Sequence, residues 1–172
     1  YLLVVLDVQD VRVGDDKRAL DSLALAKLQG VALNQGDLRL LAQLYGKRGI
    51  PERAAQILGE LNDINSDSKL KAQQATYWQM AKEWDKSIAS WRVAAKLDRQ
   101  YYWNLSQLLV QEGQYKNALV ALEKVSGRKA DVALVKTRAY YKLKRLEDAL
   151  ANAKRANEIE PSTQAESWVK YL

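Results

Sequence analysis

Small and apolar residues recur along this chain at fixed offsets, in a pattern that repeats five times. A small residue marks each copy, at Ala19, Ala54, Ser87, Ala118 and Ala149. Successive marks are 35, 33, 31 and 31 residues apart. Apolar residues stand four and seven positions after each mark, so they share one face of a helix with it. Each mark therefore predicts a helix that is packed along one side.

A second helix is predicted ahead of each mark. Nine positions before the marks stand mostly bulky residues, Asp10, Tyr45, Trp78, Leu109 and Tyr140. Three positions earlier stand mostly small ones, Asp7, Ala42, Ala75, Ser106 and Thr137. A bulky residue fills the gap between paired helices, and a small one lets them approach. Five positions before the marks stand residues of the turn, where glycine takes the positive φ that ends a helix: Gly14, Gly49, Lys82, Gly113 and Lys144.

This order of large and small residues resembles the tetratricopeptide repeat family, whose unit has ~34 residues. The best match is carried by Leu41, Ala42, Tyr45, Gly49, Ala54 and Leu58, with Pro161 at the family's closing proline. The resemblance covers nearly the whole chain. It implies an all-α fold, an α-solenoid of about five helix-turn-helix repeats with a C-terminal capping helix.

The predicted organisation is a single solenoid domain over residues 1–172, the C-terminal part of a longer chain. Its repeats are expected at about 1–34, 35–67, 68–98, 99–129 and 130–161, with the capping helix at 162–172. Pro51 suits the first turn of a helix, and Ser162 is expected to cap the last one. Asp7 and Asp10 depart from the pattern in the first repeat, as does Lys136 at a leucine position of the fifth. We therefore expect irregular pairing at both ends.

Composition excludes most hydrolase chemistry, because the chain has no histidine and no cysteine. It cannot form a Ser-His-Asp or Cys-His nucleophile, or an ordinary zinc site. The adjacent pairs Asp15-Asp16 and Glu147-Asp148 fall where helices are predicted to begin, and acidic side chains favour that end of the helix dipole. No run approaches the ~20 apolar residues of a membrane span. We predict a protein that is not an enzyme and has no cofactor, metal site or membrane span in this fragment.

The net charge of +6 is unevenly distributed. Residues 1–86 hold 12 basic and 12 acidic residues, whereas residues 87–172 hold 15 and 9. The excess includes Arg128, Lys129, Lys136, Arg138, Lys142, Lys144, Arg145, Lys154 and Arg155. Two interpretations stay open: a solvated helix surface, or a field that attracts nucleic acid or another anionic surface. Aromatic residues of the kind that stack on bases are not interleaved with these cations, so nucleic acid is the less favoured partner.

In a stack of such repeats, the first helix of each lines the concave side, and its non-packing positions form a groove. These positions predict a partner-binding groove made of Arg39, Gln43, Lys47, Gln73, Thr76, Gln79, Trp103, Asn104, Gln107, Gln111, Arg138, Tyr141 and Lys142. Amide side chains pair well with the backbone of an extended peptide, and an apolar anchor can pack on Trp103. The family's chaperone-binding carboxylate clamp is not reproduced, which disfavours a chaperone co-factor.

The other tryptophans are predicted to serve packing. Trp78 and Trp91 occupy interior positions of the third repeat, and Trp84 opens its second helix. Trp168 is expected to pack in the end cap. Only Trp103 falls at a groove position in this register.

A closer resemblance is carried by residues 17–30, by the stretch from Ile50 to Ala55, and by residues 74–85. These segments resemble the periplasmic tetratricopeptide proteins associated with TonB systems for iron uptake in marine gammaproteobacteria. The resemblance implies an exported scaffold that docks on a component of a TonB complex. No ligand cluster in the sequence itself points to iron.

Overall fold

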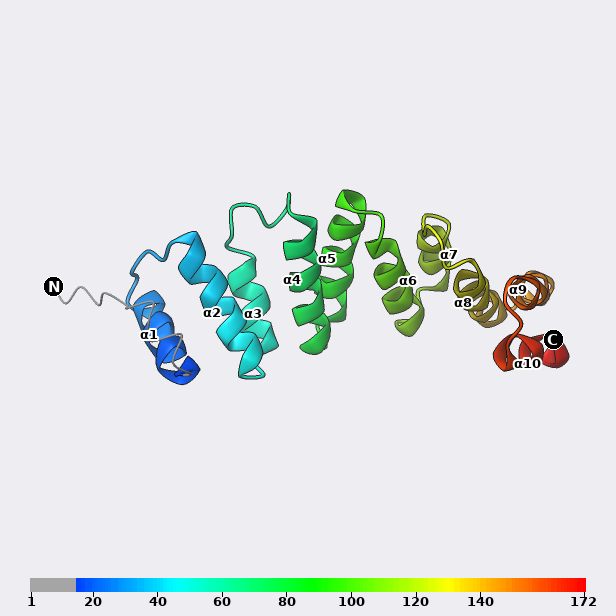
Figure 1. Cartoon of the computed structure of the whole chain (residues 1–172), viewed down its shortest axis with the longest axis horizontal. Helices are drawn as coiled ribbons and strands as arrows, with labels where there is room; N and C mark the ends of the chain where they lie inside the picture. Colours follow the sequence, from blue (N-terminus) through cyan, green and yellow to red (C-terminus); the bar gives the residue numbers. More distant parts are fainter. Residues whose placement is uncertain (1–14) are drawn as a thin grey trace. The chain divides into compact units, whose positions relative to one another are not determined.

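The computed structural model describes residues 15–172, which form ten α-helices and no β-strand (Figure 1). The helices are α1 (Asp16–Leu28), α2 (Gln35–Lys47), α3 (Pro51–Leu58), α4 (Ser68–Met80), α5 (Trp84–Leu97), α6 (Tyr101–Gln111), α7 (Tyr115–Leu122), α8 (Lys129–Lys142), α9 (Leu146–Ile159) and α10 (Thr163–Tyr171). The prediction of an all-α fold is confirmed for this part of the chain. Asp7, Asp10 and Gly14 lie outside the described residues.

Four of the helix pairs are joined by tight turns, and each turn contains one residue in the left-handed region. These residues are Gly49 (φ 73°), Lys82 (φ 59°), Gly113 (φ 71°) and Lys144 (φ 63°). All four are positions where the sequence predicts the turn. Two of the turns use lysine, whose Cβ makes this conformation less favourable than it is for glycine.

The predicted helix faces are the buried ones. Four of the five marks, Ala54, Ser87, Ala118 and Ala149, are fully buried, and Ala19 is 8% exposed. The small residues of the preceding helices are also fully buried, at Ala42, Ala75, Ser106 and Thr137. Where such a residue has a hydroxyl, the hydroxyl is hydrogen-bonded: Ser87 Oγ donates to the carbonyl of Ala75 over 2.8 Å. Serine and threonine therefore substitute for alanine here without leaving an unpaired buried polar group.

The chain divides into two compact units, Tyr1–Ser90 and Trp91–Leu172, and the division falls within α5. The prediction of a single domain over residues 1–172 stays a prediction. In the described part of the first unit, helices α1 to α4 contribute to one hydrophobic cluster, which includes Leu23, Leu41 and Leu58. Tyr77 packs against this cluster and lies over Gly46 in the last turn of α2, where a Cβ would stand 2.5 Å from the tyrosine hydroxyl oxygen. Gly46 therefore belongs to a helix contact rather than to the turn alone.

In the second unit, α8 packs against α9, and α9 against α10. The fully buried Ala156 and Ala165, together with Ala133, form the contact between these three helices. Alanine at all three positions lets the helices approach closely. Ser162 caps α10 as predicted, because its Oγ accepts a hydrogen bond from the backbone N–H of Ala165 over 3.1 Å. Figure 1 shows α10 beside α9 at the carboxyl end of this unit.

Candidate functional site

The predicted groove residues lie on the first helix of each pair, and each has an exposed or half-buried side chain. Helix α2 carries Arg39, Gln43 and Lys47, α4 carries Gln73, Thr76 and Gln79, α6 carries Trp103, Asn104, Gln107 and Gln111, and α8 carries Arg138, Tyr141 and Lys142. They are accessible to a partner, and whether they bind one stays a prediction. The surroundings of these residues differ between the two units.

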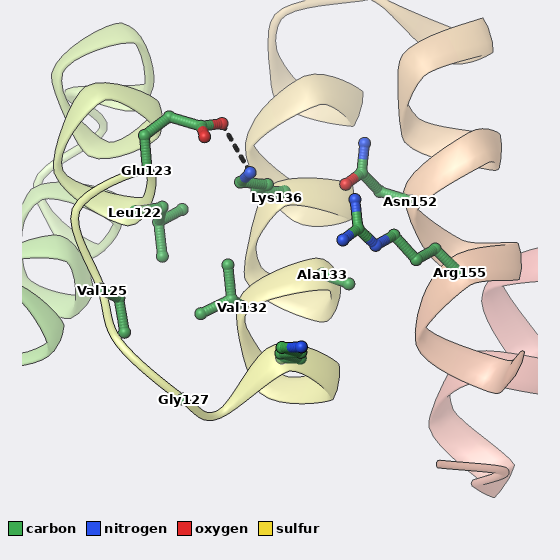
Figure 2. A pocket seen from close by; sticks show the side chains of 10 residues that line it. Leu122, Glu123, Val125, Gly127, Val132, Ala133, Lys136, Asn152 and Arg155 are labelled. Carbon is green, nitrogen blue, oxygen red and sulfur yellow. Dashed lines mark hydrogen bonds and ion pairs between the residues drawn. The ribbon is translucent and has the colours of Figure 1, made fainter. Parts of the chain in front are cut away.

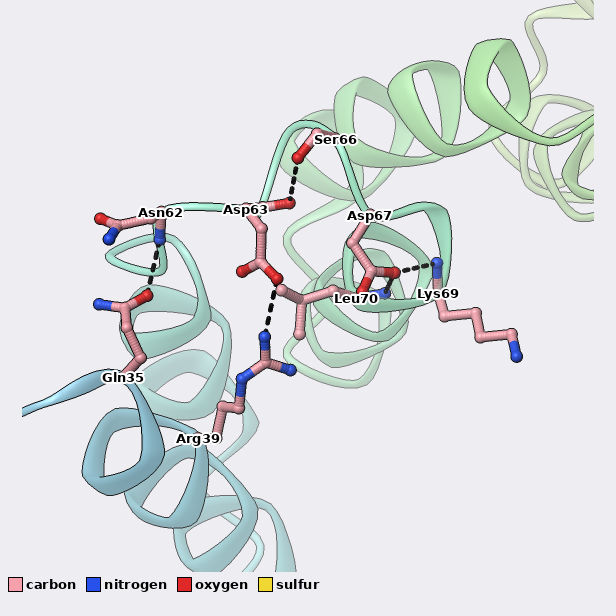
Figure 3. A network of polar contacts seen from close by, with 8 residues as sticks. All are labelled: Gln35, Arg39, Asn62, Asp63, Ser66, Asp67, Lys69 and Leu70. Carbon is pink, nitrogen blue, oxygen red and sulfur yellow. Dashed lines mark hydrogen bonds and ion pairs between the residues drawn. The ribbon is translucent and has the colours of Figure 1, made fainter.

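In the first unit, both predicted groove cations are engaged in ion pairs. Arg39 Nη2 lies 2.8 Å from Asp63 Oδ2, which ties α2 to the loop before α4 (Figure 3). Lys47 Nζ lies 3.1 Å from Asp16 Oδ2 on α1. All four side chains are more than a third exposed, and such pairs contribute about 0–1 kcal/mol each. A ligand carboxylate would have to compete with these internal partners.

The polar side chains of α4 offer less than the sequence suggests. Thr76 Oγ1 donates to the carbonyl of Ala72 in the preceding turn over 2.9 Å. Gln73 is exposed, and Gln79 is half-buried. The first unit therefore presents a polar surface on which two cations, Arg39 and Lys47, and the Thr76 hydroxyl already have partners within the chain.

In the second unit, two predicted residues from different helices line one hollow. Trp103 of α6 and Arg138 of α8 lie around a space of about 130 Å³, together with Leu134, Val135, Asp131 and Gln164. The guanidinium of Arg128 stands over the indole of Trp103, 5.3 Å from its ring centroid. Arg128 also lies 4.0 Å from Asp131, whereas Arg138 has no ion-pair partner among residues 15–172. Arg138 is therefore the charged residue of this hollow that has no ion-pair partner within the described part of the chain.

A larger hollow of about 490 Å³ adjoins it, and the two share Gln164. Its lining consists of Tyr141 on α8 with Gln164, Ser167, Trp168 and Tyr171 on α10. We call the lining of both hollows the α8–α10 surface: Trp103, Asp131, Leu134, Val135, Arg138, Tyr141, Gln164, Ser167, Trp168 and Tyr171. Leucine, valine, tryptophan and tyrosine make up most of it.

The three aromatic side chains of the larger hollow form a packed cluster. The ring of Tyr141 lies 5.4 Å from that of Trp168 and 5.7 Å from that of Tyr171, and the Trp168–Tyr171 distance is 6.0 Å. The rings are tilted or edge-on to one another, the arrangement that aromatic quadrupoles favour. Because they touch each other, they do not leave the central space of a cage for a methylated ammonium. They offer a broad apolar face instead.

The two tyrosine hydroxyls of this cluster are hydrogen-bonded to each other over 2.9 Å. The contact with Tyr141 raises the pKa of Tyr171 above its ordinary value, and nearby Lys144 opposes the shift. Tyr171 is nevertheless 68% exposed, so a partner can reach its ring.

The sequence predicts that α10 caps the stack and that Trp168 packs there. Ala165 does pack as a cap, but Gln164, Trp168 and Tyr171 lie on the side that lines the hollows. Gln164, Trp168 and Tyr171 are spaced by four and three residues, so they share one face of a helix. This spacing is the feature of the sequence that could have indicated a second exposed face on α10. Conversely, Asn104, Gln107, Gln111 and Lys142 are exposed but do not line either hollow. Trp78 and Trp91 are buried, as predicted.

The basic residues of the second unit are in several different environments. Lys136 pairs with Glu123, and Arg145 pairs with Asp148 while its guanidinium stands over the ring of Tyr140. Lys129 and Arg155 line a third hollow, between the α7–α8 loop, α8 and α9 (Figure 2). The acidic pairs Asp15-Asp16 and Glu147-Asp148 stand at the starts of α1 and α9, as predicted.

Within residues 15–172, no group of three or more metal-ligating side chains comes together. None of the helices in that range combines the length and the apolar character that crossing a bilayer requires.

Comparison with known proteins gives the fold. No protein-family model and no curated protein matches the sequence significantly. Among solved structures, a MamA crystal structure matches with a TM-score of 0.64 at 20% identity, over 95% of this chain and 90% of that one. MamA of Desulfovibrio magneticus RS-1, from residue 41 to its end, matches with a TM-score of 0.62 at 20% identity, over 80% and 82%. The C-terminal part of a TPR repeat-containing protein of Cytophaga hutchinsonii matches with a TM-score of 0.65 at 13% identity. The match covers 93% of this chain and 66% of that one. The chain therefore has the tetratricopeptide-like α-solenoid fold that the repeat pattern predicts.

Proposed function

We propose that this protein is a non-catalytic interaction scaffold that binds a peptide or a segment of a partner protein on the α8–α10 surface. The observation that carries the proposal is the aromatic and aliphatic lining of two adjoining hollows, formed by half-buried residues of α6, α8 and α10 and by the exposed Tyr171. The fold is compatible with such a role, because arrays of helical repeats present extended binding surfaces.

The chemistry of this surface favours an extended peptide with apolar side chains. Tyrosine and tryptophan bury large areas on binding and predominate among residues that contribute most to interfaces. Trp103 and the cluster of Tyr141, Trp168 and Tyr171 offer two apolar contact areas. Gln164 lines both hollows, and its amide can both donate to and accept from a peptide backbone.

Charge adds a preference for acidic residues in the ligand. Arg138 lines the smaller hollow without an ion-pair partner among the described residues, and a guanidinium binds carboxylates in bidentate fashion. Asp131 is already beside Arg128. An acidic side chain flanking the apolar anchors would therefore find a cation that is free to pair.

A photo-crosslinking experiment in the native cell tests the proposal. Benzoylphenylalanine is placed at Gln164, which lines both hollows, or at Val120, which is 61% exposed on α7 outside this surface. We expect a specific crosslinked partner from position 164 and none from position 120. Mass spectrometry identifies the crosslinked segment, which is then synthesised as a peptide.

The peptide is next titrated against purified variants. Arg138→Ala with Tyr171→Ala removes two exposed side chains of the surface, and we expect at least about a tenfold loss of affinity. Val120→Ala with Lys154→Ala changes two exposed positions elsewhere and should leave affinity within about twofold. Equal affinity for both double variants would exclude binding on the α8–α10 surface.

The sequence resemblance further suggests an exported protein and a partner in a TonB complex. Both remain proposals that the crosslinking experiment addresses, since it reports the partner's identity directly. Recovery of a TonB-complex component from position 164 would support them, and recovery of an unrelated partner would count against the TonB role while leaving the scaffold function in place.

A further inference from the structure

The third hollow is built differently and lies on another face of α8. Its space of about 190 Å³ is several times the roughly 30 Å³ that a water molecule takes in the liquid. The α7–α8 loop, α8 and α9 all line it, with Lys129, Lys136, Arg155, Glu123 and Asn152 as its polar members (Figure 2). We call it the α7–α9 hollow.

The α7–α9 hollow carries a surplus of positive charge. Of its three cations, Lys136 is paired, with Nζ 2.6 Å from Glu123 Oε1. Lys129 and Arg155 have no ion-pair partner among residues 15–172. Asn152 is also engaged, because its Nδ2 donates to the carbonyl of Asp148 over 2.9 Å. Two cations therefore remain to meet a ligand.

Apolar side chains form part of the wall of this hollow. Its wall includes Leu122, Val125, Val132 and Ala133, and the side chain of Lys136 is only 16% exposed. Lys129 and Arg155 are themselves exposed, so an anion can reach both charges from solvent. Figure 2 shows Arg155 extending from α9 toward α8, on the side of the hollow opposite the loop that carries Val125.

We propose that the α7–α9 hollow binds a compact oxyanion, a carboxylate or a phosphate group, held chiefly by Arg155 and Lys129. The planar guanidinium pairs with two oxygens of either group at once. The amino end of α8, where Lys129 is the first residue, adds the favourable end of the helix dipole. Glu123, which is paired with Lys136, is 67% exposed at this hollow. Its negative charge repels a long polyanion more than it repels a single small anion.

This site is separate from the α8–α10 surface. The α7–α9 hollow is lined on α8 by Lys129, Val132 and Lys136, which share one face of the helix. The smaller hollow of the α8–α10 surface is lined by Asp131, Leu134 and Arg138, and each of these residues comes two positions after its counterpart in the first set. Two residues of a helix correspond to a rotation of about 200°, so the two sets lie on opposite sides of α8. Binding of an anion therefore does not depend on the proposed peptide-binding function.

Nuclear magnetic resonance on the full chain tests the proposal with inorganic phosphate and with acetate, each against sodium chloride at equal ionic strength. We expect saturable shifts of the Gly127 amide and of the Arg155 Nε–H with phosphate, acetate or both, and none with chloride. Saturation by phosphate alone assigns a phosphate ligand, and saturation by acetate alone assigns a carboxylate. Equal, non-saturating shifts with all three salts would overturn the proposal.

Two double variants locate the site. Lys129→Gln with Arg155→Gln should weaken binding of the saturating anion at least about tenfold. Lys116→Gln with Lys154→Gln removes the same charge from exposed positions on α7 and α9 outside the hollow, and should keep affinity within about twofold. Equal weakening in both variants would mean that the anion responds to net charge only, which overturns the site. If a variant does not fold, the comparison of phosphate and acetate with sodium chloride on the unchanged chain still tests whether the hollow binds an anion.

Discussion

The hydroxyls of Tyr141 and Tyr171 lie 2.9 Å apart and join α8 to α10 by a hydrogen bond at the edge of the larger hollow. The two residues are 30 positions apart in the sequence, and each belongs to the same aromatic cluster as Trp168. This contact links the aromatic side chains of α10 to α8. Because the contact raises the pKa of Tyr171, titration of this tyrosine reports whether α10 lies beside α8.

We expect Tyr141→Phe to lower the pKa of Tyr171 toward the ordinary tyrosine value of about 10. The hydrogen bond with Tyr141 is the main cause of the raised pKa, and the substitution removes it. Because the folded-state pKa is raised, the contact stabilises the fold at neutral pH, and this contribution is lost as pH rises through the raised pKa. Ultraviolet titration with Tyr171→Phe as the reference measures the shift, and an unchanged pKa in Tyr141→Phe would contradict the contact.

Ala165→Asp should detach α10 from α9. Ala165 is fully buried between Ala133 and Ala156, and an unpaired carboxylate there costs at least about 3 kcal/mol. We expect Trp168 fluorescence to shift to longer wavelength and the pKa of Tyr171 to return toward its ordinary value. Ser167→Asp places the same charge at an exposed position of α10 and should change the fluorescence little. A native spectrum in Ala165→Asp would show that the alanine contact does not hold the helix.

Lys82→Gly should raise the free energy of unfolding by about 0.5–1 kcal/mol. Lys82 has φ 59°, and glycine relieves this backbone strain by more than it adds in unfolded-state entropy. Lys154→Gly makes the same exchange inside α9 and should instead destabilise by about 1 kcal/mol. Urea denaturation compares the two variants, and a loss of stability in both would show that the turn carries no strain.

Gly46→Ala should destabilise the first unit by about 1–2 kcal/mol. The new Cβ would meet the Tyr77 hydroxyl oxygen at 2.5 Å, so the ring must move from its place against the hydrophobic cluster. In the background of Tyr77→Leu, the same substitution should cost much less. Thermal denaturation of the four proteins gives the coupling, and equal costs in both backgrounds would rule out the steric contact.

Lys136→Met should be neutral or stabilising by up to about 1 kcal/mol, because it removes a charge from a position that is only 16% exposed. Glu123→Gln should destabilise by about 1 kcal/mol, because it leaves the Lys136 ammonium without its carboxylate. Urea denaturation of each variant measures these effects. A larger loss in Lys136→Met than in Glu123→Gln would show that the ion pair contributes more than the desolvation of the lysine costs.

The core and the turns of this fold were predictable from the sequence. Ser87 and Ala118 are fully buried as their places in the repeat require, and Lys82 takes the left-handed conformation that glycine takes at the same place in two other turns. Such features depend on helical periodicity and on the sizes of neighbouring side chains, which are local properties of the sequence. The all-α solenoid follows from them.

The candidate site was predictable only in part. Trp103, Arg138 and Tyr141 were selected by register, and each lines a hollow. Trp168 was assigned to packing, since its helix follows the last repeat and the register gives no groove position there.

The sequence by itself determined which faces of the helices are buried, where the turns lie, and that the chain has no histidine or cysteine for nucleophilic chemistry. Only the tertiary structure decided which exposed side chains meet. It brings Tyr171 to Tyr141, and Arg155 to the hollow lined by Lys129. The physical reason is that burial follows the periodicity of a single helix, whereas a binding site depends on the packing of several helices, which residue spacing within one helix does not specify.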